Sequence, residues 1–182
     1  MRIELVKGVN LNIIPSKQFK TTRIFISFIK NIESKKELAE RALLANYLEM
    51  CSQNYPTQID IARKLSQMYG ASFGSSVDRR GNYQLINFSI DYIEGKYLVG
   101  NEDLFSEVIE FLKEIIFNPL KVGENKNFDE ETFTRQKNNT ITYLKSIKED
   151  KQAYATAKLE SFTLIMRFNK YHHLVKVKML RS

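Results

Sequence analysis

The pattern that most limits the fold is an alternation of apolar and polar residues near the middle of the chain. The alternating side chains are Ile86, Asn87, Phe88, Ser89, Ile90, Asp91 and Tyr92. Successive side chains of a strand point to opposite faces, so this pattern predicts a strand with one packed face and one wetter face. The turn chemistry of residues 79–82 predicts that residues 71–78 form the other arm of a hairpin. Such a hairpin needs a second layer of structure on its apolar face.

Helical patterns surround this hairpin and supply the second layer. Ser34 and Glu37 have the spacing of a capping box, and the helix that they open becomes nearly apolar all round in its second half. Thr57 and Asp60 open a second helix, which Gly70 ends. The predicted helices cover residues 34–50, 57–70, 103–117 and 129–149, with a break near Asp150 before a continuation to about residue 165. The helical period predicts inward-facing residues in the last three of them: Ile61, Leu65, Met68 and Tyr69; Leu104, Val108, Phe111, Leu112 and Ile115; and Phe133, Thr140, Leu144 and Ile147 on one side of the last helix.

The first third of the chain adds strands. Residues 3–14 predict a strand pair with a turn at Gly8, and residues 21–29 predict a strand that is buried on both faces. Residues 121–127 are predicted to be a polar loop. The order of elements indicates an α+β fold in which a largely antiparallel sheet packs against helices. We expect one domain over residues 1–160, followed by an atypical tail over residues 161–182.

The formal charge of +7 is concentrated in that tail, which contains five basic residues and no acid. The remaining charge is nearly balanced and resembles an ordinary surface more than a nucleic-acid footprint. No apolar run reaches the roughly 20 residues needed to cross a bilayer, and no secretory signal is present. We therefore expect a cytoplasmic protein without nucleic-acid or membrane partners. The single Cys51 is expected to be a buried core residue.

The segment "NYLEMC" raises the question of a metal site. On one continuous helix, Asn46, Glu49 and Met50 share a face. This is the spacing of the inverted zinc motif H-x-x-E-H, in which two histidines hold the metal and the glutamate is the general base. Asn46 and Met50 stand at the two ligand positions, and Glu49 stands at the position of the base.

With its surroundings, this segment resembles the insulinase-like (M16) zinc peptidases and the mitochondrial processing peptidase fold. The similar segments, in order, are "TTRIFISFI", the helix with the inverted motif, a Pro-Thr pair, "ASFGSSVDRR", "YQLINFSIDYI" and "FDEETFTRQKNNTITYLKSIKEDKQAYA". The resemblance covers residues 1–159 and is strongest to degenerate members encoded beside an active sister in Gram-positive bacteria. It implies one half of such a metallohydrolase, with zinc as the cofactor of active members only.

The departures from the family motif argue against zinc. An amide and a thioether are poor ligands for Zn²⁺, so neither Asn46 nor Met50 replaces a histidine. The segment that should supply the third ligand has no acid between Glu131 and Glu149, and Cys51 lies about 100° around the helix from Met50. We expect neither a metal nor another cofactor.

Other candidate residues have ordinary interpretations. Glu49 is either a vestigial or substrate-contacting carboxylate or, as we favour, a residue at the rim of the core that pairs with a nearby base. His172 and His173 are adjacent and point apart, so they do not predict a metal pair. The Arg79-Arg80 turn is interpreted as a solvated hairpin tip.

The resemblance implies a catalytically inactive partner subunit of an active zinc metallopeptidase, which would help to enclose peptide substrates. Peptides would bind by strand addition to a sheet edge. Two alternatives remain: an active zinc endopeptidase, and a nucleic-acid or membrane-surface binder that uses its basic tail. The unusual tail suggests a truncated or frame-shifted product. The peptide substrate, the identity of the partner and the oligomeric state do not follow from the sequence.

Overall fold

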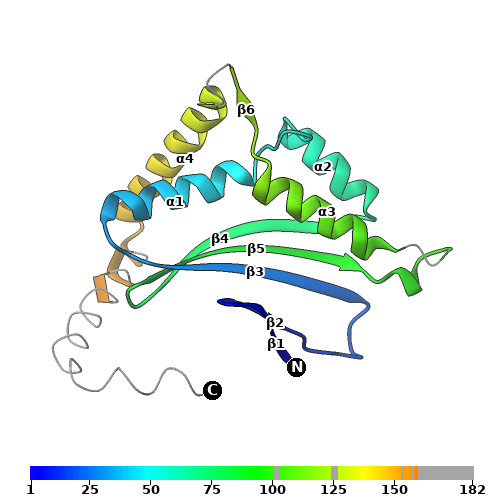
Figure 1. Ribbon diagram of the computed structural model, residues 1–182. Coiled ribbons are helices and arrows are strands. Elements are labelled where there is room, and N and C mark those ends of the chain that lie inside the picture. The colour runs from blue at the N-terminus through cyan, green and yellow to red at the C-terminus, as the bar shows by residue number, and fades with distance from the viewer. Residues whose placement is uncertain (101–102, 124–126, 153, 157, 160–182) are drawn as a thin grey trace, which may run out of the picture. The chain divides into compact units, whose positions relative to one another are not determined.

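The computed structural model describes residues 1–100, 103–123, 127–152, 154–156 and 158–159. The chain has an α+β fold with antiparallel sheets and helices, as the sequence predicts (Figure 1). Its elements are β1 (Arg2–Val6), β2 (Val9–Asn12), β3 (Thr21–Asn31), α1 (Lys35–Leu48), α2 (Gln58–Gln67), β4 (Ser72–Arg80), β5 (Tyr83–Ile93), the 3₁₀ helix η1 (Gly95–Tyr97), α3 (Leu104–Phe117), β6 (Lys121–Val122), β7 (Asn127–Phe128) and α4 (Glu130–Glu149).

The three long strands form one sheet in the order β3-β5-β4. The predicted hairpin is confirmed as β4 and β5, and Gly81 takes a positive φ of 59° in its turn. The expectation that residues 21–29 are buried on both faces is wrong. Ile24 and Ile26 pack against the core, whereas Phe25 and Ile29 are exposed. Apolar residues on both faces of a strand do not require that both faces are covered, and β3 lies at the edge of this sheet.

The chain divides into two compact units, each built from separate segments. The first unit contains residues 1–27, 48–76 and 87–120, and the second contains residues 28–47, 77–86 and 121–182. Strands β3, β4 and β5 each contribute residues to both units.

The core of the first unit lies between α2, α3 and the strands. Its buried residues are Ile61, Met68, Ala71, Ile90, Tyr92, Leu104, Val108, Phe111, Leu112 and Ile115. All five residues of α3 that the helical period places inward are among them. The capping box of Thr57 and Asp60 is confirmed. Tyr69, expected inward, is half exposed at a positive φ of 56°, because α2 has already ended and the chain turns through Gly70.

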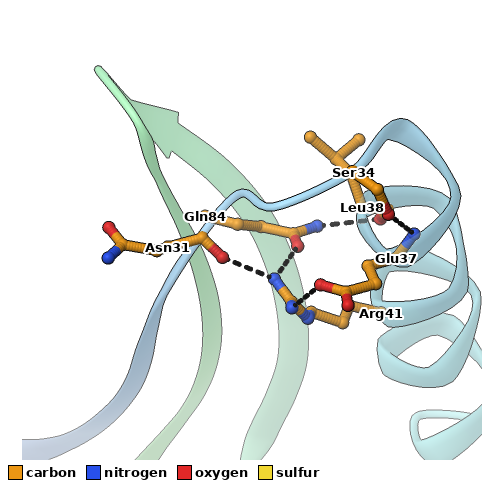
Figure 2. A network of polar contacts seen from close by, with 6 residues as sticks. All are labelled: Asn31, Ser34, Glu37, Leu38, Arg41 and Gln84. Atoms are coloured by element: carbon orange, nitrogen blue, oxygen red, sulfur yellow. Dashed lines mark hydrogen bonds and ion pairs between the residues drawn. The ribbon is translucent and has the colours of Figure 1, made fainter.

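A polar network fixes the start of α1 in the second unit (Figure 2). The hydroxyl of Ser34 accepts a hydrogen bond from the backbone N–H of Glu37 at 3.1 Å, so this part of the predicted capping box is confirmed. The Glu37 carboxylate forms an ion pair with Arg41. Arg41 also donates to the carbonyl of Asn31 at 3.1 Å and to the side chain of Gln84 at 3.4 Å. The Gln84 amide, only 2% exposed, donates to the Leu38 carbonyl at 2.9 Å.

The end of the described chain differs from the prediction in two places. Residues 121–127, predicted to be a loop, contain the short strand β6 and the start of β7, which pair antiparallel. Gly123, directly after β6, has a φ of 75°. Leu144 of α4, predicted to face inward, is exposed, because a helical period identifies an apolar stripe but not the element that covers it.

The predicted break at Asp150 is confirmed, and helical residues resume at 151–152, 154–156 and 158–159. The continuation predicted beyond Leu159, together with the basic tail and its two histidines, lies outside the described residues.

Candidate functional site

Asn46 lies near the end of α1, and its side chain contacts α4 within the second unit. The Asn46 amide Nδ2 donates a hydrogen bond to the Thr140 hydroxyl Oγ1 at 3.3 Å. That hydroxyl donates in turn to the Gln136 carbonyl at 2.8 Å. The structure therefore brings Asn46, which the resemblance places at the first ligand position, together with the segment that the resemblance compares with the third ligand's segment. A neutral hydrogen bond joins the two positions.

Glu49 lies in the first unit and contacts strand β4. Its Oε2 accepts hydrogen bonds from the Ser75 hydroxyl at 2.5 Å and from the Ser75 backbone N–H at 3.3 Å. The core-rim interpretation predicts a basic partner, and the partner found here is a serine. Two donors from one residue hold the carboxylate in one orientation.

The helix ends before Glu49, so the prediction of one continuous helix through Met50 is wrong. Helix α1 ends at Leu48, and Glu49 and Met50 lie in the turn that follows. Met50 is partly buried there. The spacing of 46, 49 and 50 predicts a common face only while the backbone stays helical, and here it leaves the helix before two of the three positions.

Cys51 is 1% exposed and lies beside Ser52, which is also buried. The Ser52 backbone N–H donates to the Tyr55 carbonyl at 2.8 Å, and its hydroxyl accepts from the Tyr55 N–H at 3.2 Å. These bonds close a compact turn after α1. Cys51 is a core residue, as the sequence predicts.

Tyr47 ties α1 to the start of α4 in the second unit. Its phenol oxygen accepts a hydrogen bond from the Asp129 N–H at 2.9 Å, and its ring lies 4.9 Å from that of Phe128. Asp129 is the N-cap of α4, and its carboxylate accepts from the Thr132 backbone N–H at 2.9 Å. This backbone hydrogen bond, and a second from the Thr132 side chain, lower the pKa of Asp129.

The residues that the resemblance places at metal positions do not fit a zinc ion. Zinc in proteins is held by thiolate, imidazole or carboxylate groups. Asn46 and Met50 offer none of these, and the amide of Asn46 is already hydrogen-bonded to Thr140. Over the described residues, no three His, Cys, Asp or Glu side chains lie together in a way that could hold a metal ion.

One of the comparisons with known proteins supports the resemblance in the sequence. No family model matches the chain. It is 22% identical over 152 residues to the "Probable inactive metalloprotease YmfF" of Bacillus subtilis (strain 168), which covers 84% of this chain and 35% of that protein. The crystal structure of a conserved protein from Enterococcus faecalis V583 matches with a TM-score of 0.80 and 39% identity. That match covers 94% of this chain and 39% of the other chain.

The chain thus spans little more than a third of the length of each of these two relatives. Over most of its own length it is similar to a protein named as an inactive metalloprotease. In the described part of the chain, no helix is long and apolar enough to cross a membrane.

The sequence analysis did not identify two residues, Ser75 and Gln84, that make hydrogen bonds described above. Ser75, the partner of Glu49, lies in a predicted strand with nothing to distinguish it from its neighbour Ser76. Gln84 breaks the apolar face of β5 with a polar group, and this irregularity is the one signal that could have indicated a buried network.

Proposed function

We propose that this chain is a catalytically inactive insulinase-like domain that assembles with an active, zinc-bearing homologue in peptide processing. It helps to enclose the peptide and provides part of the peptide-binding surface, while the partner contributes the metal and the general base. Zinc chemistry belongs to the partner alone.

The observation that carries this proposal is the hydrogen bond between Asn46 and Thr140. In the family that the sequence resembles, a histidine of the first helix and a carboxylate of the later helix approach each other because both bind zinc. Here the corresponding helices α1 and α4 are also in contact, through the neutral amide of Asn46 and the hydroxyl of Thr140. The two helices lie close together although neither offers a zinc ligand at the contact. This arrangement supports a role for the fold that does not depend on a metal.

Peptide binding requires only a sheet edge. Strands β3 and β4 are the outer strands in the order β3-β5-β4, and each runs for nine residues or more. An extended peptide can pair with the backbone of such a strand, so the main chain supplies affinity without a catalytic group. The domain could therefore bind substrate without cleaving it.

The test uses purified components. The chain is mixed with an active insulinase-like homologue from the same organism, chosen for an intact H-x-x-E-H motif, and complex formation, zinc content and peptide cleavage are measured. We expect a complex in which the zinc content equals that of the homologue, and which cleaves the peptide faster than the homologue alone does. A chain that neither binds the homologue nor changes its activity would contradict the proposal.

A matched pair of variants tests which of the two proteins supplies the catalytic glutamate. Glu49→Gln in this chain keeps an oxygen acceptor for Ser75 and should leave cleavage by the complex unchanged. The same change at the general base of the homologue should abolish cleavage. If Glu49→Gln abolishes cleavage while the complex still forms, or if the isolated chain holds one tightly bound zinc, then the active-endopeptidase alternative is correct.

The basic-tail alternative has its own test. Binding to duplex DNA and to anionic vesicles is measured at several salt concentrations, with and without residues 161–182. Our proposal predicts weak binding in both cases. Strong binding that is lost with the tail would favour the alternative.

A further inference from the structure

A polar hollow in the first unit is not used by the function proposed above. The start of β3, the end of β5 with η1, and the start of α3 surround it (Figure 1). Its lining includes Thr22, Tyr92, Glu94, Lys96, Asp103 and Phe105, and its volume is about 480 Å³. Pockets that hold small molecules typically measure roughly 300–1,000 Å³, so this hollow has room for one.

Hydrogen bonds hold the inner wall of the hollow in place. Tyr92 is only 6% exposed, and its hydroxyl shares a hydrogen bond with the side chain of Thr22. The Thr22 hydroxyl Oγ1 donates to Glu94 Oε1 at 3.0 Å, and Glu94 Oε2 forms an ion pair with Lys96. One hydroxyl and one ammonium group therefore orient the Glu94 carboxylate before any ligand arrives.

The start of α3 orients a second carboxylate at the hollow. Asp103 is the N-cap of α3, and it accepts hydrogen bonds from the Phe105 backbone N–H at 3.0 Å and from the Ser106 hydroxyl at 2.9 Å. Burial raises the pKa of Tyr92 most, and the negative charges of Glu94 and Asp103 raise it further. Both carboxylates therefore act on the same buried hydroxyl. An ionised carboxylate has about four acceptor positions, so each can accept another donor.

Positive charge borders the same hollow. The hydrogen bond with Glu94 is the main cause that raises the pKa of Lys96, so this lysine is charged at neutral pH. The Lys96 ammonium lies 5.0 Å from the centroid of the Tyr97 ring, and the Lys20 ammonium lies 5.6 Å from the same centroid. The two acids and the two lysines add to no net charge, but they present both signs to a ligand.

This balance of charge limits the chemistry of the ligand. A simple cation or a simple anion would gain little here, because each would also face groups of its own sign. A zwitterion carries both signs and can pair with both kinds of group. Phe105, at the edge of the hollow, is 54% exposed and offers an apolar surface to the rest of such a ligand.

We propose that this hollow binds a free α-amino acid with an aliphatic side chain. The ammonium group of the amino acid donates to Glu94 and Asp103, and its carboxylate accepts from Lys96. The aliphatic side chain contacts the ring of Phe105. The site does not depend on the proposed function, because it shares no residue with the contacts between α1 and α4 or with the contact of Glu49.

The test uses the full chain and three ligands of similar shape. Leucine carries both charged groups, isoamylamine lacks the carboxylate, and isocaproate lacks the ammonium group. In calorimetric titrations at neutral pH, we expect one leucine to bind per chain with a dissociation constant below about 1 mM. Each of the other two ligands should bind roughly tenfold more weakly or worse, because it loses the hydrogen bonds of one charged group.

Two lysines of similar exposure provide a matched pair of variants. Lys96→Met keeps the aliphatic stem and removes the ammonium group, so leucine should bind roughly tenfold more weakly. Isoamylamine should bind this variant no more weakly than before, so the preference for leucine disappears. Lys113→Met on α3 is the control. Lys96 is 61% exposed, Lys113 is 67% exposed, and Lys113 also pairs with a glutamate. The control should change leucine binding by no more than about twofold.

Three results would overturn the proposal. These are the absence of saturable leucine binding, binding of isoamylamine or isocaproate as tight as that of leucine, and equal effects of the two lysine variants. Thermal unfolding of each variant is measured first. If Lys96→Met alters folding, Glu94→Gln replaces it, because the amide keeps an oxygen acceptor for Thr22. That variant should bind leucine more weakly and isocaproate no more weakly than the unmodified chain does.

Discussion

The phenol oxygen of Tyr47 accepts a hydrogen bond of 2.9 Å from the backbone N–H of Asp129, 82 residues later in the chain. The preceding residue, Asn46, donates to Thr140, about three helical turns further along α4. Two adjacent residues of α1 therefore contact α4 at its N-cap and near its middle. Two hydrogen bonds between uncharged groups therefore position α4 against α1.

Replacing Tyr47 with Phe should destabilise the protein by about 1 kcal/mol, the net contribution of one hydrogen bond. The ring contact with Phe128 remains in this variant. Tyr47→Ala, which also removes the buried ring, should cost about 3–5 kcal/mol. Urea unfolding measures both values. Equal losses in the two variants would show that the hydroxyl contact, rather than the ring, dominates.

Replacing Arg41 with Met should lower stability by about 2 kcal/mol, because it removes charge-assisted hydrogen bonds and leaves the buried Gln84 oxygen without this donor. The Arg41 side chain is 17% exposed. Lys36→Met on the same helix is the control, since Lys36 is 85% exposed and its pair with Glu40 spans 3.7 Å. That change should alter stability by less than about 0.5 kcal/mol.

Zinc should leave the stability of the chain unchanged. A ligand at 100 times its dissociation constant stabilises a protein by about 2.7 kcal/mol, so a specific site would raise the thermal midpoint visibly. The double variant Asn46→His, Thr140→Glu places an imidazole and a carboxylate at the contact and should respond to zinc, which shows that the assay is sensitive. A zinc-dependent rise in the unmodified chain, reversed by a chelator, would refute our description of the site.

The Asp129 cap predicts a pH dependence. The Thr132 backbone and side chain lower the pKa of Asp129 in the folded state. Its contribution is therefore complete above the ordinary aspartate pKa and is lost as the pH falls through the lowered value. Asp129→Asn keeps a capping side chain but does not titrate. The stability difference between the two proteins should shrink as the pH falls from 7 to about 3, and a constant difference would contradict this assignment.

Local patterns predicted most of the elements. The alternation in β5, the capping box of Thr57 with Asp60 and the five inward residues of α3 are set by the geometry of strands and helices over short distances. The same patterns failed where burial depended on a distant neighbour. Phe25 and Leu144 lie on apolar stripes, but they are exposed.

The sequence alone determined which chemical groups stand at the positions that the resemblance compares with metal ligands, since no fold can turn an amide or a thioether into an imidazole. Only the tertiary structure decided that Asn46 meets Thr140, that Glu49 meets Ser75, and that α1 ends at Leu48. These contacts join residues as many as 94 positions apart. Such pairings arise from the packing of whole elements, which a local pattern does not contain.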